Sequence, residues 1–194
     1  MKYCSLATED ELSDGTLRKV LLTTRPDLHV FTSRISNGYG QLRKNVLAFN
    51  NAAKSVPQLV LTDLDRGNCA PELIALWTQR KKLHPKLWFR VAVRETETWL
   101  LAHREALADF LKIQINLVPH APETLLDPKQ KLFALAKLSP IAERRRAIVP
   151  VGSASQGPDY NGEMLIYVRD YWKPAKAKEL SPSLKKAIIR LADL

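Results

Sequence analysis

Residues Leu59 to Asp65 read Leu-Val-Leu-Thr-Asp-Leu-Asp, an apolar run followed by two aspartates. A short apolar run bounded by turn signals is typical of a buried β-strand. Successive side chains of a strand point to opposite faces, so Asp63 and Asp65 share a face if the strand continues through both. If the strand ends at Asp63, the loop can still bend both carboxylates round one ion. Two such ligands suit Mg2+, although Asp is also common in plain turns.

Strand-like and helix-like segments alternate on both sides of this stretch. Strands are expected at Lys2–Thr8, Leu28–Thr32, Gln58–Thr62 and Leu87–Val93. Helices between them are indicated by apolar residues at helical spacing and by capping residues, and one further helix is expected from Glu95 to Leu111. The alternation predicts an α/β fold with a central, mainly parallel sheet of about four strands and helices on both faces.

The pattern changes after residue 118. Prolines interrupt the chain, and only short helices are expected, at Pro128–Leu138, Glu163–Tyr171 and Ser183–Ala192. We therefore predict an α/β core at residues 1–118 and a helical, loop-rich C-terminal region at residues 119–194. The second region should pack on the core as part of a single domain.

Composition limits the class of protein. The 194 residues carry a net charge of +10, which is compatible with a polyanionic partner such as DNA or RNA. Cys4 and Cys69 are too few and too far apart for a disulfide scaffold or a zinc site. The N-terminal segment does not resemble a signal peptide, and no apolar run reaches the ~18–20 residues of a membrane span. We expect a soluble, cytoplasmic protein.

Carboxylates follow three of the expected strands. Ligand sites in open α/β sheets form at the carboxyl ends of strands, so these acids should meet at one edge. They are Glu9 and Glu11 after the first strand, Asp63 and Asp65 after the third, and Glu95 and Glu97 after the fourth. Gathered carboxylates repel each other unless a cation lies among them. Alternatively, the first group forms a solvated turn and the last favours a helix N-terminus.

Several motifs resemble those of Toprim-like proteins, and the longer match is to the DUF4276 family. Residues 8–19 resemble the first Toprim motif, and Asp63-Leu64-Asp65 resembles the Toprim Asp-x-Asp motif. Features of DUF4276 proteins are seen at residues 63–71, 90–102, 127–129, 157–161 and 181–184. The resemblance covers nearly the whole chain. It departs from the family pattern at His103, where an aspartate is usual, and at Asp10, where Toprim proteins have glycine.

The resemblance implies a role for several acids. Glu9 would be a general acid/base or a metal ligand, Asp63 and Asp65 would hold Mg2+ or Mn2+, and Glu97 would be a further ligand or a supporting acid. Proteins of this family are often encoded beside ABC-type ATPases, in an arrangement similar to a split overcoming-lysogenization-defect nuclease. The resemblance therefore implies a nuclease in antiphage defence with an ATPase partner.

Basic and aromatic residues supply candidate contacts to nucleic acid. Arg94, Arg66 and Lys129 are candidate phosphate ligands, and Arg43 adds positive charge near the same edge. For Lys129 a plain solvated lysine is the favoured alternative. Tyr39, Tyr160 and Trp172 could stack on bases, although we favour core or loop packing for all three.

The sequence thus predicts a Mg2+-dependent, Toprim-like nuclease that cleaves phosphodiesters, with DNA favoured over RNA. Dimerisation or a partner ATPase is expected to support activity in so small a chain. The alternative is a non-catalytic, regulatory subunit of that ATPase. Strand transfer of the topoisomerase kind is disfavoured, because it needs a nucleophilic tyrosine and further domains.

Overall fold

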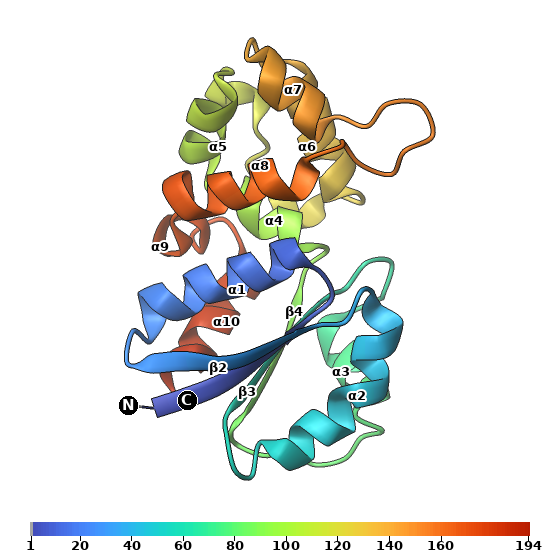
Figure 1. Ribbon diagram of the computed structural model, residues 1–194, viewed down its shortest axis with the longest axis vertical. Coiled ribbons are helices and arrows are strands. Elements are labelled where there is room, and N and C mark those ends of the chain that lie inside the picture. The colour runs from blue at the N-terminus through green and yellow to red at the C-terminus, as the bar shows by residue number, and fades with distance from the viewer. Residues whose placement is uncertain (1) are drawn as a thin grey trace.

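The computed structural model describes residues 2–194, whose strands form a single sheet (Figure 1). The strands are β1 (Lys2–Thr8), β2 (Leu28–Ile35), β3 (Gln58–Asp63) and β4 (Leu87–Ala92). Their order in the sheet is β2-β1-β3-β4, and every pairing is parallel. The predicted α/β class is confirmed, and the arrangement is consistent with a Toprim-like fold.

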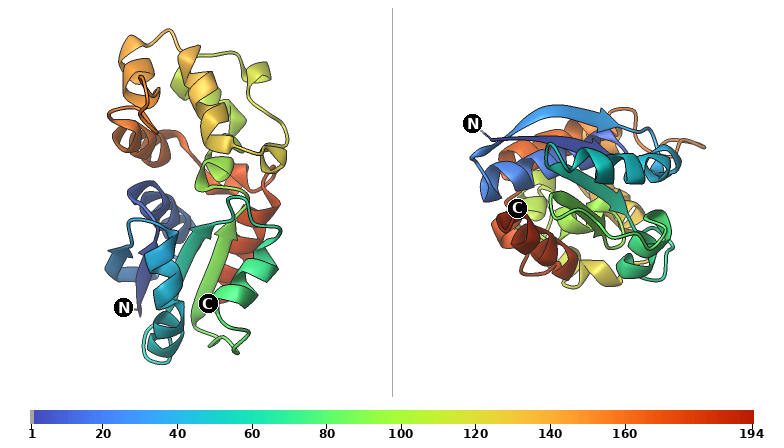
Figure 2. Two further views of the ribbon diagram at one scale, coloured as in Figure 1. Left: turned by 90° about the vertical axis from the view of Figure 1, so that its right-hand side faces the viewer. Right: turned by 90° about the horizontal axis from the view of Figure 1, so that it is seen from below.

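Helices cover both faces of the sheet, because strand side chains alternate between two apolar layers. On one face Leu6, Leu59 and Trp88 pack in the layer with helices α1 (Glu11–Thr24) and α10 (Pro182–Ala192). On the other face Val60 and Phe89 pack in the layer with α2 (Tyr39–Ala52) and α3 (Ala70–Trp77). The two views of Figure 2 show these layers from the side and from below.

The helix expected from Glu95 to Leu111 is two helices, so that prediction was wrong. They are α4 (Thr96–Leu101) and α5 (Arg104–Leu111). Between them His103 leaves the helical conformation, with φ −94° and ψ 72°, and is buried. Its Nδ1 accepts a hydrogen bond of 3.1 Å from the backbone N–H of Lys173. A contact across 70 residues therefore fixes the break, and local apolar spacing could not reveal it.

The C-terminal region is helical as predicted, although its helices divide between two places. Figure 1 shows α5 to α8 gathered beyond the carboxyl end of the sheet, whereas α10 returns to cover the sheet. The remaining elements are η1 (Ile115–Leu117), η2 (Pro122–Thr124), α6 (Pro128–Lys137), α7 (Ala142–Ile148), α8 (Tyr160–Ile166), the π-helical η3 (Tyr167–Tyr171) and α9 (Pro174–Ala177).

One apolar cluster joins the two parts of the structure. It runs from β1 and β3 through α4 to residues of α6, α8 and α10. Within residues 2–194, no helix combines the length and the apolar character needed to cross a membrane.

Replacing Leu59 with alanine should destabilise the fold strongly, because this central-strand side chain is 0% exposed. We expect the free energy of unfolding to fall by about 2–5 kcal/mol. Phe31→Ala is the matched control, since Phe31 on β2 is 75% exposed, and it should change stability by no more than about 0.5 kcal/mol. Urea unfolding of both variants measures the difference. An equal loss of stability in the two variants would contradict the placement of β3 at the buried centre of the sheet.

Candidate functional site

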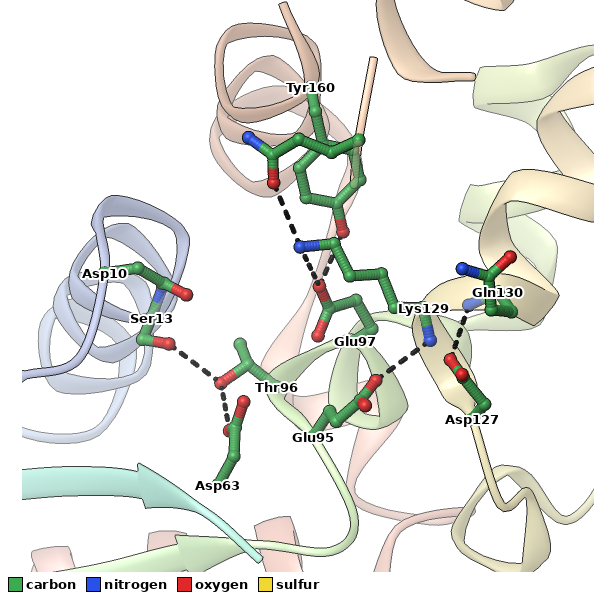
Figure 3. A network of polar contacts seen from close by, with 11 residues as sticks. Asp10, Ser13, Asp63, Glu95, Thr96, Glu97, Asp127, Lys129, Gln130 and Tyr160 are labelled. Carbon is green, nitrogen blue, oxygen red and sulfur yellow. Dashed lines mark hydrogen bonds and ion pairs between the residues drawn. The ribbon is translucent and has the colours of Figure 1, made fainter. Parts of the chain in front are cut away.

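Carboxylates from three adjacent segments meet at the carboxyl edge of the sheet. Glu9 follows β1, Asp63 ends β3, and Glu95 and Glu97 lie where α4 begins after β4. β3 pairs with both β1 and β4, so these strand ends are neighbours. Figure 3 shows Asp63, Glu95 and Glu97 around the first turn of α4. The structure therefore brings together acids that lie 88 residues apart at most in the chain, from Glu9 to Glu97.

Glu9 and Asp63 are joined through β3. One oxygen of Glu9 accepts hydrogen bonds from the Thr62 hydroxyl and, at 3.1 Å, from the backbone N–H of Asp63. Asp63 in turn accepts a hydrogen bond of 2.9 Å from the Thr96 hydroxyl, which lies 3.1 Å from the Ser13 hydroxyl. These hydroxyl groups were not predicted as part of the site, since a single serine or threonine in a strand or helix carries no sequence signal of its own.

Asp10 is a further acid beside the site. Its side chain accepts a hydrogen bond of 2.8 Å from the backbone N–H of Ser13 and so caps α1. The position that departs from the Toprim glycine thus has a structural role, while its charge still faces the cluster. The acidic run at residues 9–11 was the signal that could have identified it.

Glu97 lies in the interior and is only 5% exposed. The Tyr160 hydroxyl donates a hydrogen bond of 2.7 Å to Glu97, and the Lys129 ammonium lies 4.0 Å from the same carboxylate oxygen. Lys129 also lies 4.6 Å from the centre of the Tyr160 ring and donates a hydrogen bond to Gln156. Lys129 is therefore a counter-ion of Glu97, a role that was not predicted from the sequence. Its contact with phosphate stays a prediction.

Glu95 connects the edge to α6. Its carboxylate accepts a hydrogen bond of 3.0 Å from the backbone N–H of Lys129, in the first turn of α6. Asp127 caps the same helix through the backbone N–H of Gln130, at 2.8 Å. A carboxylate at a helix N-terminus is favoured by the helix dipole as well as by the hydrogen bond.

Asp65 does not continue the strand. β3 ends at Asp63, and Asp65 has φ +49°, in the left-handed region. The strand therefore does not continue through both aspartates, and Asp65 lies in the loop that follows it. Arg94 donates hydrogen bonds to the backbone carbonyls of Asp65 and Gly67, at 3.1 and 3.0 Å. Arg94 therefore fixes the loop that carries Asp65 and Arg66.

Glu11 lies on the outer side of the site. It is exposed, and the Asn161 side chain donates a hydrogen bond of 3.5 Å to it. It takes no part in the contacts that join Glu9, Asp63 and Thr96.

Burial and mutual repulsion raise the pKa of most of these carboxyl groups. The pKa of Asp63 lies well above its ordinary value, first because of burial and then because of the charges of Glu97 and Glu9. Burial also raises the pKa of Glu9, of Asp65 and of Glu97, the last despite Lys129 and Tyr160. Burial, and next the charge of Glu97, raises the pKa of Glu95 to about 7. Such a cluster favours a bound proton or cation.

The donor chemistry of the site fits a divalent cation, although the acids are not already arranged around one. Carboxylate and hydroxyl oxygens are ligands that Mg2+ accepts. Within residues 2–194, however, no three His, Cys, Asp or Glu side chains form a group that could hold a metal ion as they stand. Hydrogen bonds from Thr62, Thr96 and Tyr160 orient the acids instead.

A cavity of about 1080 Å³ opens in front of the end of β3. Its lining includes Asp63, Asp65, Arg66, Arg94 and Glu95, with α2 and α3 on the opposite wall. Glu9, Glu97 and Lys129 do not line it. The predicted site residues thus form an interior cluster of acids, Glu9, Asp63, Glu95 and Glu97, and a cleft-facing group that shares Asp63 and Glu95 with it.

No family model, curated protein or solved structure matches this chain.

Stability should fall as the pH rises from about 4.5 to about 7. Glu95 has an ordinary pKa of 4.5 in the unfolded chain and about 7 in the fold, so over this range the folded state holds the extra proton. Ionisation of Glu95 therefore destabilises the fold. A glutamine cannot ionise, so the stability of Glu95→Gln should fall less steeply with pH than that of the wild type. Urea unfolding between pH 4.5 and 8 in EDTA measures it. Glu143→Gln, at an exposed position of α7, should keep the wild-type slope.

A wild-type stability that rises over this pH range would contradict the assignment of Glu95. So would a Glu95→Gln variant with the slope of the wild type.

Proposed function

We propose that this protein is a Mg2+- or Mn2+-dependent nuclease of the Toprim type, which hydrolyses phosphodiester bonds in nucleic acid, with DNA favoured over RNA. The position of Asp63 carries the proposal. Asp63 lines the open cavity at the end of β3, and the charges of both Glu97 and Glu9 act on it. A cation bound there would relieve the repulsion and would face a substrate in the cleft.

The roles of the side chains follow from their positions. Asp63, with Asp65 and Glu9, would hold the cation, which when bound would polarise the phosphate and favour a water nucleophile. The raised pKa of Glu9 suits a role in proton transfer. Arg66 lines the cavity and would contact phosphate, while Arg94 keeps the Asp65 loop in place. Glu97 would act on Asp63 through its charge.

The proposal extends to the surroundings of the protein. The resemblance to DUF4276 and other Toprim-like proteins supports a cytoplasmic role in antiphage defence beside an ABC-type ATPase. The net charge of +10 supports a nucleic-acid partner, because it favours association with phosphate backbones.

A regulatory, non-catalytic subunit of the ATPase is the second candidate, and one observation favours it. Glu9, Asp63, Glu95 and Glu97 each already accept a hydrogen bond from a protein donor. Residues 2–194 contain no acid group already arranged for a metal. A structural cluster of this kind could stabilise the fold without holding a cation.

Asp63→Asn should remove Mg2+ binding and lower cleavage by at least about 100-fold, the scale of losing one group that stabilises transition-state charge. The substitution keeps the size of the side chain and removes the negative charge. Calorimetric Mg2+ titration and a cleavage assay on single- and double-stranded DNA measure the two effects. Glu143→Gln is the control and should behave as the wild type.

Metal binding and cleavage that are unchanged in Asp63→Asn would refute the nuclease proposal. A wild-type protein that neither binds Mg2+ nor cleaves DNA, alone or with its ATPase, would favour the regulatory subunit.

A further inference from the structure

Three aromatic rings form a row from the core to the cleft wall opposite the acids. Trp77 at the end of α3 lies between Phe89 of β4, at 5.8 Å between ring centres, and Tyr39 of α2, at 6.4 Å. The planes of Tyr39 and Trp77 differ by 29°, so these rings are nearly parallel. Phe89 and Trp77 are 2% and 6% exposed, whereas Tyr39 is 57% exposed. Tyr39 thus has an exposed ring that packs on the buried ring of Trp77.

This exposure separates Tyr39 from the other aromatic residues considered for stacking. Tyr160 and Trp172 are 1% and 0% exposed, so their rings are unavailable to a ligand. The expected core or loop packing is confirmed for both of them. Tyr39 packs on Trp77 but remains exposed, and it lines the same cavity as Asp63 and Asp65.

Two arginines without protein partners line the cavity with Tyr39. Arg43 lies one helical turn after Tyr39 on α2, so the two side chains share a face. Arg66 lies on the loop after β3, directly after Asp65 in the chain. Among the described residues, neither guanidinium has a hydrogen bond or an ion pair, and both are exposed. Guanidinium groups in this state are suited to hold phosphate oxygens.

We propose that this part of the cavity is a subsite for an unpaired nucleotide, and hence that the substrate is a single-stranded nucleic acid. The base stacks on Tyr39, the phosphates on either side of it contact Arg43 and Arg66, and the strand then passes Asp63. An aromatic face accepts every base, so the subsite is tolerant of sequence. A paired duplex cannot use it, because its bases are already stacked on each other. The inference rests on the proposed function and names its substrate class.

The charge of the cavity adds a condition. Five carboxylates line it, those of Asp63, Asp65, Glu72, Glu95 and Asp127, against the three guanidinium groups of Arg43, Arg66 and Arg94. The acids would repel a phosphate backbone when ionised. Binding of the strand should therefore be stronger with a divalent cation than in EDTA.

The test uses the full chain and single-stranded oligonucleotides that carry 2-aminopurine, whose fluorescence falls when its ring stacks. Binding is measured with Ca2+ and with EDTA, for the single strand and for the matching duplex. We expect the single strand to bind at least about 10-fold more tightly than the duplex. Tyr39→Ala should weaken single-strand binding about 10-fold or more and abolish quenching, whereas Tyr39→Phe should preserve both.

Two further variants keep the test decisive. Arg43→Gln should weaken binding while leaving the quenching at saturation intact, since it removes a phosphate contact and leaves the ring. Phe31→Ala, an exposed aromatic residue outside the cavity, should bind as the wild type. Equal binding of single strand and duplex, or full quenching in Tyr39→Ala, would overturn the subsite.

The outcomes separate the subsite from the proposed nuclease. Quenching that depends on Tyr39, in a protein that does not cleave, would keep the subsite and reject the nuclease. Cleavage that depends on Asp63 but proceeds with an unchanged KM in Tyr39→Ala would keep the nuclease and reject the subsite.

Discussion

Repulsion among carboxylates buried at one edge of the sheet is the constraint on which this structure depends. Ionised carboxylates withdrawn from water are costly unless each has a donor, a proton or a cation. Here Thr62 and Thr96 supply hydroxyl donors to Glu9 and Asp63, and Tyr160 and Lys129 come from the C-terminal helices to Glu97. The same contacts that partly neutralise the acids also attach α6 and α8 to the carboxyl edge of the sheet. The C-terminal region is therefore part of the site as well as part of the core.

The neutralisation is incomplete, and the proposed function depends on this. Burial and the charges of Glu97 and Glu9 still hold the pKa of Asp63 well above its ordinary value. Asp63 also reaches the cavity, where Asp65, Arg66 and Tyr39 lie. A cation would balance the charge of the carboxylates, and a phosphate entering with it would balance the charge of the guanidinium groups. The proposed nuclease and the proposed single-strand subsite use this one junction.

Local patterns in the sequence were enough to predict the sheet but only part of the site. Apolar runs and capping residues located the strands, and the rule that sites form at strand carboxyl ends brought Glu9, Asp63 and Glu97 to one edge. The partners of these acids could not be predicted, because Tyr160 meets Glu97 across 63 residues of chain. The break at His103 and the exposure of Tyr39 also depend on long-range packing, to which helical periodicity is insensitive. The same limit applied to Lys129, whose neighbour Glu97 comes from another helix.

The proposed nuclease needs a divalent cation beside Asp63 at the acidic edge. Crystals grown with Mn2+ would reveal such a cation through the anomalous scattering of the metal. We expect a peak within about 2.0–2.6 Å of an Asp63 carboxylate oxygen, with a carboxylate of Glu9 or Asp65 turned toward it. Saturating Mn2+ that leaves this edge without a peak, while the hydrogen bonds from Thr96 to Asp63 and from Thr62 to Glu9 stay in place, would contradict the proposal.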